Sequence, residues 1–302
     1  YYFRIKMHGI GGLIDLAENK TIVFGNEQNS DEIIWTGKIE SLQEKGFKSA
    51  VHDIQPLSKL FNYLQKALRS ARKVHFLPPY QAYNKILLAA LINQPIDHLK
   101  PSTAFIKAVV AQRAIKEEQE IIEIEKALSA TVEMHKLAMR ITKAGMREYE
   151  IINAMRHYSA DLGYTFAYPP IVTKHGEILH NLHSHHIIEA SDMILNDAGC
   201  ETELGYAADL TRTYPVSGTF STAQREIYEI VLQAIRDSSV QLSPHIKFRD
   251  IHLSSVTTLL TGLKDIGLVK GNIDDAVAND VFTLFFQCGT GHMMGLDVHD
   301  ME

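Results

Sequence analysis

The feature that most restricts the fold of this chain is a long stretch without glycine or proline, from Arg113 to Ala138. Isoleucine and leucine recur among its many glutamates at helical spacing, which predicts an amphipathic helix with one solvated face. Gly145 ends this pattern, and a second helix is predicted from Arg147 to Leu162, closed by Gly163. The apolar stripe of the first helix consists of Ile115, Ile121, Ile122, Ile124 and Leu128.

The residues before this helix, 1–112, predict a small α/β domain. Two apolar runs, Gly12–Leu16 and Thr21–Gly25, flank a polar turn and predict a β-hairpin. Leucines at helical spacing predict a helix within Pro56–Leu68. A short strand is predicted at Lys73–Leu77, because two prolines stop the apolar run that follows the lysine.

The residues from 113 to 302 mix strand and helix signals without a regular βαβ alternation, so the predicted fold class is α+β. Alternating apolar runs separated by glycine-bearing turns mark the strands, and apolar residues on one helical face mark the helices. The predicted strands are Pro170–Lys174, Ile178–Asn181, Met193–Asp197 and Tyr206–Thr213, and the predicted helices are Ala223–Ser238 and Ile251–Leu263.

Composition excludes several classes of function. The chain has 302 residues, a formal charge of −6 and a pI of about 6.2, so it lacks the basic footprint of a nucleic-acid-binding protein. The longest apolar run, Ile86–Ile92, is much shorter than the ~20 residues that a membrane-spanning helix needs. Two cysteines are too few for a disulfide framework, which favours a reducing, cytoplasmic setting. No signal peptide is visible.

Two aspartates near glycines are the first candidates for chemistry. Asp197 ends an apolar run, and Asp209 lies 12 positions later, beyond a turn that contains Gly199 and Gly205. A hairpin would place the two carboxylates side by side on neighbouring strands, with Cβ atoms about 5 Å apart. Such a pair stays ionised only when a cation lies between the carboxylates, so one interpretation is a metal site with oxygen ligands. The alternative is a pair of surface turn residues.

Histidines form two groups. Five histidines lie between His175 and His186, and we interpret most of this tract as a solvated polar loop rather than a metal site. His180 differs, because it follows the apolar pair Ile178-Leu179 at a predicted strand end. The second group is His292 and His299, and glycines beside His292 allow close approach of a ligand or of backbone.

Several motifs in a fixed order resemble the pita-bread metallopeptidases, and within them most closely the Xaa-Pro aminopeptidases. These motifs are Ile178–Asn181, Asp197–Glu201, Gly205–Gly218, Gln224–Tyr228 and Gly291–Asp300. The resemblance extends over the whole chain. It implies a creatinase/prolidase-type N-terminal α/β domain in residues 1–112, with its start missing, and a pita-bread catalytic domain in residues 113–302, with its C-terminal part missing.

The resemblance also implies roles for individual residues. Asp197 would bind one metal ion, Asp209 would bridge two ions and His292 would bind the other. His180 and His299 would act as catalytic residues that hydrogen-bond the substrate. The implied cofactor is a pair of divalent ions, of which Mn²⁺ suits oxygen-rich ligation best, while Zn²⁺ and Co²⁺ are alternatives.

The chain departs from the family pattern at its end. The family uses two further glutamate ligands downstream of the histidine segment, and this chain, which stops at Glu302, contains neither. It also begins at Tyr1 without an initiator methionine. We therefore expect most of a larger enzyme, and we expect the 302 residues alone to bind metal weakly and to be inactive.

The expected function is a metal-dependent aminopeptidase that uses a metal-bridged hydroxide to release the first residue from peptides with proline second. One alternative is an Xaa-Pro dipeptidase (prolidase). The other is a non-catalytic pita-bread scaffold, if the chain truly ends at 302. The expected partners are Xaa-Pro peptides and further copies of the chain in a dimer or tetramer, with no nucleic acid and no membrane.

Overall fold

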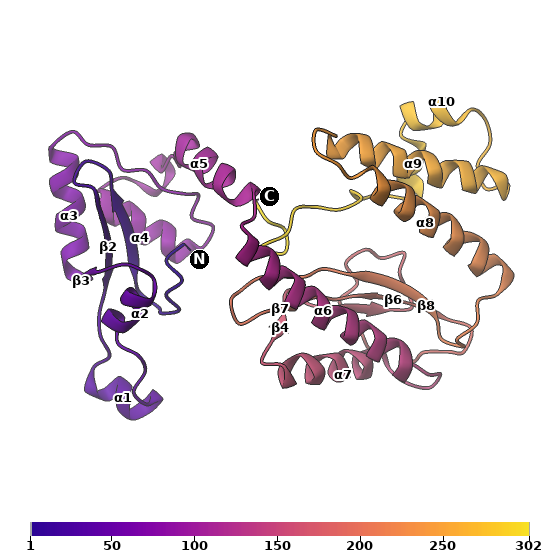
Figure 1. Cartoon of the computed structure of the whole chain (residues 1–302), viewed down its shortest axis with the longest axis horizontal. Helices are drawn as coiled ribbons and strands as arrows, with labels where there is room; N and C mark the ends of the chain where they lie inside the picture. Colours follow the sequence, from indigo (N-terminus) through magenta and orange to yellow (C-terminus); the bar gives the residue numbers. More distant parts are fainter. Residues whose placement is uncertain (1, 302) are drawn as a thin grey trace. The chain divides into compact units, whose positions relative to one another are not determined.

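The structure is a computed structural model that describes residues 2–301. The chain forms two compact units, Tyr1–Ala114 and Ile115–Glu302, whereas the sequence analysis places the domain boundary between residues 112 and 113. Each unit has its own strands, helices and core (Figure 1). Helices combined with mainly antiparallel strands confirm the predicted α+β class.

The first unit contains a three-stranded sheet in the order β1 (Gly11–Asp15), β2 (Lys20–Gly25) and β3 (Asp53–Pro56). Strands β1 and β2 form the predicted hairpin, with Leu13 opposite Ile22. Strand β3 runs parallel to β2, because the intervening chain crosses over through two short helices.

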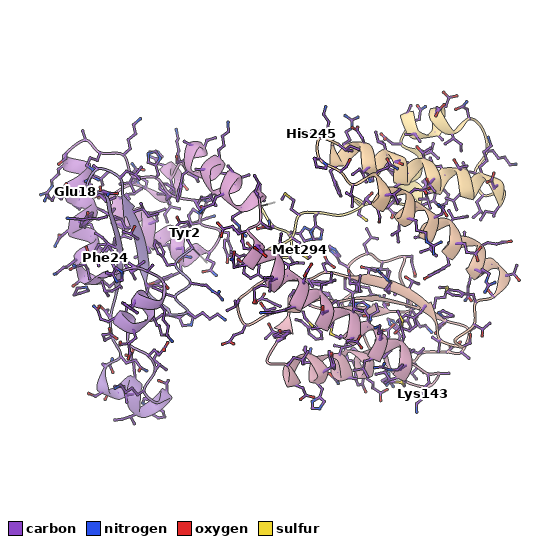
Figure 2. The ribbon with its side chains drawn as sticks, viewed as in Figure 1. Tyr2, Glu18, Phe24, Lys143, His245 and Met294 are labelled. Atoms are coloured by element: carbon purple, nitrogen blue, oxygen red, sulfur yellow. The ribbon has the colours of Figure 1, made fainter. Side chains whose placement is uncertain are left out.

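The core of this unit lies between β2 and helix α3 (Ser58–Arg69), which the leucine spacing predicts. Phe24 is fully buried inside the unit, whereas Glu18 lies at the hairpin turn (Figure 2). Burying large apolar side chains from both elements is the main stabilising contribution. The buried members of this cluster are Ile22, Phe24, Leu60 and Leu64.

Two short helices in this unit are absent from the sequence prediction although their start signals are present. Helices α1 (Ser30–Thr36) and α2 (Leu42–Lys48) each begin with a capping box, in which the side chains of the capping residue and of a glutamate bond each other's backbone. The unit also contains helices α4 (Ala82–Ile92) and α5 (Thr103–Ala114).

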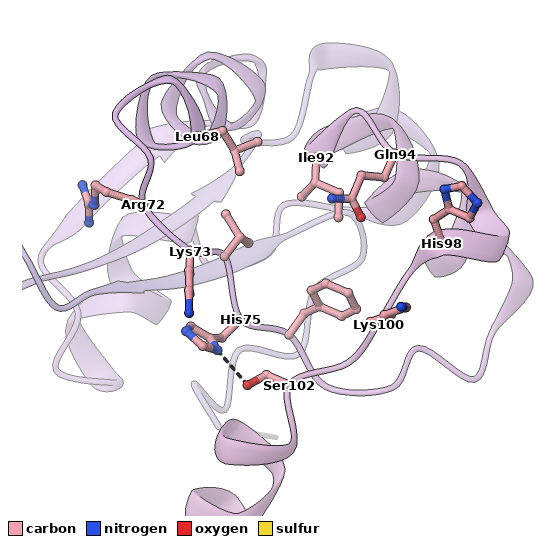
Figure 3. A pocket seen from close by; sticks show the side chains of 11 residues that line it. Leu68, Arg72, Lys73, His75, Ile92, Gln94, His98, Lys100 and Ser102 are labelled. Atoms are coloured by element: carbon pink, nitrogen blue, oxygen red, sulfur yellow. Dashed lines mark hydrogen bonds between the residues drawn. The ribbon is translucent and has the colours of Figure 1, made fainter.

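The predicted strand at Lys73–Leu77 is wrong, because the structure pairs this segment with no described strand. Its side chains still alternate between half-buried and exposed, as in a strand. Val74, His75 and Phe76 all line a cavity of about 780 Å³. His75 also bonds Ser102 through its Nδ1 atom at 2.7 Å (Figure 3).

Asp15 fixes the β1–β2 turn. This carboxylate is only 3% exposed and accepts hydrogen bonds from the backbone N–H groups of Ala17 and Glu18, both at 3.0 Å. It also accepts from the Tyr63 hydroxyl at 2.7 Å and from the Arg72 guanidinium. The Arg72 hydrogen bond holds the pKa of Asp15 well below its usual range.

We expect Asp15→Asn to lower the free energy of unfolding of this unit by about 2 kcal/mol near neutral pH, because the donors around Asp15 lose a charged, buried acceptor. The folded pKa of Asp15 lies below the unfolded value. The stabilisation is therefore complete above about pH 5 and is lost as the pH falls towards the folded value. Hydrogen exchange of β1 and β2 amides checks this result, with exposed Asp97→Asn as the control. An equal difference between wild type and variant at low and neutral pH would contradict it.

The second unit begins with helices α6 (Glu118–Ile141) and α7 (Glu148–Asp161), which pack on each other and against strands. Both helices were predicted, but α6 starts at Glu118 and not at Arg113. The predicted apolar stripe on α6 is also wrong, because Ile121 and Ile122 are each 46% exposed. The buried face consists of Ala127, Ala130, Thr131, Met134, His135 and Ala138.

The buried face of α6 has small and polar residues because the backbone of residues 198–200 approaches the helix closely. Thr131 Oγ1 accepts the N–H of Cys200 at 2.9 Å, and the ring of His135 bonds the carbonyl of Ala198 at 3.0 Å. Small and hydrogen-bonding side chains fit such a contact, whereas isoleucines do not. A buried polar contact of this kind leaves no periodic apolar signal in the sequence.

The central sheet of this unit has the order β5 (Ile171–Thr173), β6 (Met193–Asp197) and β8 (Thr211–Pro215), with both pairings antiparallel. Strand β6 has the predicted bounds. The predicted strand Tyr206–Thr213 is placed too early, and Ile178–Asn181 forms no strand in the described structure. A short ladder pairs β4 (Thr165–Phe166) with β7 (Cys200–Glu201).

A second apolar cluster lies among the C-terminal helices. Helices α8 (Thr222–Gln241) and α9 (Phe248–Asp265) correspond to the two predicted helices and pack along each other, with α10 (Ile273–Ala278) on α9 (Figure 1). None of the described helices is both long enough and apolar enough to cross a membrane. The buried members of the cluster are Val256, Leu260, Leu263, Val269, Ala276 and Phe282.

Candidate metal centre

The two candidate aspartates lie on one antiparallel ladder. Asp197, the last residue of β6, pairs with Thr211, and beyond β6 the ladder continues through a bond from Ala208 N–H to the carbonyl of Cys200 at 2.9 Å. Asp209 therefore lies diagonally across from Asp197 on the same face, two residues from the directly opposite position. The prediction of carboxylates on paired segments is confirmed, and the expected side-by-side placement is corrected to a diagonal one.

Gly199 allows the two strands to come this close. A Cβ atom at this position would lie 1.7 Å from the carbonyl oxygen of Ala208 and 3.2 Å from the backbone nitrogen of Asp209. No side chain fits that space without movement of backbone. Gly205, at φ +84°, closes the turn at the far end of the same hairpin.

A tyrosine that the sequence analysis does not identify joins the two carboxylates. The hydroxyl of Tyr168 lies 2.5 Å from Oδ1 of Asp197 and 2.6 Å from Oδ1 of Asp209. A phenol donates one hydrogen, so the second contact needs a proton on a carboxyl group. Burial raises the pKa of Asp197, and the nearby Asp209 charge raises it further. Burial and the same carboxylates raise the pKa of Tyr168.

His292 meets Asp209 from the C-terminal segment. Its Nε2 lies 3.0 Å from Oδ2 of Asp209, and its Nδ1 lies 2.9 Å from the carbonyl oxygen of Met293. The ring of His299 stacks on that of His292, with centroids 3.9 Å apart and an interplanar angle of 14°. Hydrogen bonds and ring stacking thus connect four of the five predicted site residues, Asp197, Asp209, His292 and His299.

His180 is the fifth predicted residue. No hydrogen bond among the described residues joins it to this group, but it lies close enough to Asp197 for its charge to lower the pKa of that carboxyl, which burial raises. It lies exposed in the irregular segment that replaces the predicted strand. Other histidines of the tract bind carboxylates, since His175 lies 3.0 Å from Glu177 and His186 lies 2.9 Å from Glu148. These contacts agree with the interpretation of the tract as a polar loop.

Helix α6 hydrogen-bonds the hairpin that carries Asp197 and Asp209. Burial lowers the pKa of His135, which favours a neutral ring. A carbonyl only accepts, so Nε2 of His135 donates to the oxygen of Ala198 and Nδ1 accepts from the side-chain amide of Asn196. Near the helix start, Glu120 accepts from the hydroxyl of Tyr206 at 3.0 Å. These bonds fix the residues on both sides of Asp197 and the turn before Asp209.

The donor set fits a divalent cation in its chemistry. Oxygens of Asp197 and Asp209 both face the hydroxyl position of Tyr168, and the imidazole of His292 lies against Asp209. Carboxylates with an imidazole suit first-row divalent metals. Within residues 2–301, no three such side chains already adopt a geometry that holds an ion.

Comparisons with known proteins extend over most of the chain. A family model described as metallopeptidase family M24 matches residues 123–302. The Xaa-Pro aminopeptidase of Escherichia coli (strain K12) is 29% identical over 301 residues, covering 95% of this chain and 67% of that protein. A probable Xaa-Pro aminopeptidase of Fusarium vanettenii is 31% identical over 298 residues, covering 95% and 62%.

Solved structures give the same result. Zinc-substituted E. coli aminopeptidase P in complex with product matches with a TM-score of 0.84 at 29% identity, over 95% of this chain and 67% of that one. The chain thus spans between 62% and 67% of the length of these relatives. The resemblance to the Xaa-Pro aminopeptidases and their pita-bread fold is confirmed. Because the family model matches more than half of its residues, the chain belongs to metallopeptidase family M24.

Proposed function

We propose that the protein carrying this chain is a metal-dependent aminopeptidase that releases the first residue from peptides with proline second. The observation that carries the proposal is the meeting of Asp197, Asp209 and His292 in one group. The chain belongs to a metallopeptidase family, and the relatives described above are named Xaa-Pro aminopeptidases. Their names supply the substrate class of the proposal.

Asp197, Asp209 and His292 would hold the metal, with Asp209 as the residue shared between two ions. Mn²⁺ is the ion we favour, because carboxylate oxygens predominate among these donors. When bound, the metal would supply an activated water and an electrophile for the scissile carbonyl. A zinc-substituted relative has been solved, so Zn²⁺ belongs in the same test.

Several residues of the site hold protons that metal binding would displace. Nδ1 of His292 faces the carbonyl oxygen of Met293 and therefore donates, while Nε2 shares one proton with the facing carboxyl oxygen of Asp209. The bond to Met293 orients the ring and leaves Nε2 directed at the metal position once its proton leaves. The proton that a carboxyl group holds in its contact with Tyr168 would likewise leave. Metal binding therefore releases protons at this site.

His299 and His180 are the proposed catalytic residues. His299 is exposed and stacked on His292, which places its ring at the edge of the metal group, where it can meet a peptide. His180 is exposed on the segment after β5. Each would donate a hydrogen bond to the substrate carbonyl or to the tetrahedral intermediate, where negative charge develops.

A peptide assay tests the proposal on the protein expressed from its full reading frame. After metal removal and reconstitution with Mn²⁺ or Zn²⁺, we expect release of the first residue from Ala-Pro-Ala and not from Ala-Ala-Ala. Cleavage of Ala-Pro with Ala-Pro-Ala left intact would instead identify a dipeptidase. Metal binding without hydrolysis of either peptide would overturn the proposal in favour of a binding scaffold.

His299→Ala should lower kcat by about 10²-fold while metal content stays intact. The variant loses a hydrogen-bond donor to the substrate but keeps every proposed metal ligand. Metal analysis and steady-state kinetics on the same sample give this result. The control is His157→Ala, an exposed histidine on α7 whose loss should change neither quantity. Loss of metal from the His299 variant would identify His299 as a ligand.

We also propose a cytoplasmic location and a homo-oligomeric assembly, either a dimer or a tetramer. Both cysteines, Cys200 and Cys288, are free, which fits a reducing compartment. Fractionation of the source cells tests the location, and light scattering of the purified protein tests the assembly. A periplasmic or secreted protein, or a monomer at high concentration, would contradict the respective proposal.

A further inference from the structure

A buried ion pair lies beside the candidate metal centre. Nζ of Lys116 is 2.8 Å from Oδ2 of Asp300, and the side chains are only 14% and 1% exposed. Lys116 comes just before helix α6, and Asp300 directly follows His299. The pair therefore connects the start of α6 to the segment that carries both histidines of the site.

Backbone hydrogen bonds close the histidine segment into a compact loop, and the ion pair lies at its end. The N–H of Asp300 donates to the carbonyl of Met293 at 2.9 Å, and the N–H of Gly295 donates to that of Asp297 at 3.1 Å. A Cβ atom on Gly295 would lie 2.6 Å from Oδ2 of Asp300 and 2.9 Å from Cε of Lys116. The loop therefore rests directly on the ion pair.

The same loop is fixed to the aspartate hairpin. The carbonyl of Gly295 accepts the N–H of Ala207 at 2.9 Å, two residues before Asp209. Glu120, one turn further along from Lys116, bonds Tyr206 at 3.0 Å on the other side of Ala207. The start of α6 thus contacts both the histidine loop and the hairpin.

We propose that Lys116 and Asp300 form a positioning pair that sets the rings of His292 and His299 relative to Asp209. The pair holds Asp300, next to His299, and the backbone of Asp300 bonds Met293, next to His292, so we infer that the stacked arrangement of the two rings depends on the pair. The consequence for metal binding rests on the proposed function, whereas the consequence for the stacked rings does not. Neither residue touches the reacting atoms in this role.

The alternative is that the pair only stabilises the fold. A buried ion pair can often be replaced by apolar residues of similar volume without loss of stability, whereas removal of one partner leaves an unpaired buried charge. The double variant Lys116→Met/Asp300→Leu is therefore the informative one. It removes the directional contact while keeping the site filled. The control Glu123→Leu/Lys126→Met removes a more exposed ion pair on α6.

Two readouts separate the possibilities in the full-length protein. The first is the proton chemical shifts of the His292 and His299 rings without metal, assigned through His292→Gln and His299→Gln. Stacked rings shield each other, so we expect the double variant to shift these signals towards solvated values. The second is the dissociation constant for Mn²⁺, which we expect to rise at least tenfold, with no change in the control.

The outcomes are distinct. A folded double variant with unchanged histidine shifts would overturn the proposal, whatever its metal affinity. Changed shifts with an unchanged Mn²⁺ dissociation constant would also overturn it, because the histidines would then move without consequence for the site. Failure of the wild-type protein to bind Mn²⁺ would count against the proposed function, while the shifts would still decide whether the pair positions the rings. Should the double variant fail to fold, Asp300→Asn is measured by the same two readouts.

Discussion

Replacing Asp209 by Asn is expected to lower metal-dependent release of the first residue from an Xaa-Pro-Yaa peptide by at least about 10³-fold, or about 4 kcal/mol of barrier. Asp209 contacts two other residues of the site, since Tyr168 bonds one of its carboxylate oxygens and His292 bonds the other. The amide keeps the shape but offers one oxygen and no charge. A bridging role between cations needs both oxygens and the charge.

The variant should fold, because an amide still accepts one hydrogen bond and donates another at this position. We expect its bound metal to fall below that of the wild type, as measured by elemental analysis, while its circular dichroism stays unchanged. Asp161→Asn, at an exposed position on α7, is the matched control and should retain metal and activity. Full activity in the Asp209 variant would remove the bridging role.

The parts of the fold that sequence reasoning predicts are those with a local signal. The β1–β2 hairpin, strand β6 and helices α7, α8 and α9 all combine a periodic apolar pattern with turn residues. Helices α1 and α2 carry their signal in capping boxes at Asn29 and Ser41, which an apolar pattern alone does not reveal. The segment Lys73–Leu77 has the alternation of a strand, but strand pairing also depends on a partner that no local pattern specifies.

The residues of the candidate site also divide into those with a local sequence signal and those without one. Asp197, Asp209 and His292 stand in recognisable motifs, and the structure brings them together. Tyr168 and His135 reach the site only through the packing of distant elements, so no spacing in the sequence identifies them. The inner face of α6 is a related case, because backbone bonds at Thr131 and His135 replace the apolar stripe that periodicity predicts.

Gly199→Ala is expected to damage fold and site together. The added Cβ would lie 1.7 Å from the backbone oxygen of Ala208. Because this contact is with backbone, rotation of a side chain cannot relieve it, and the two strands must move apart. Overpacking against backbone costs about 3 kcal/mol or more. Because Ala208 precedes Asp209, the same displacement moves one carboxylate away from the other. We expect a lower unfolding temperature and Mn²⁺ affinity reduced by at least about 10²-fold, or about 2.7 kcal/mol.

Gly289→Ala is the matched control, because its Cβ would lie 3.8 Å from the nearest atom, the carbonyl oxygen of Gly291. That distance is ordinary contact, and the control should change neither quantity. Thermal unfolding and metal titration of both variants give the comparison. A Gly199 variant with wild-type metal affinity would mean that the Asp197–Asp209 diagonal tolerates strand separation. The convergence of the carboxylates on Tyr168 would then arise from side-chain rotation rather than from the close approach of backbone at Gly199.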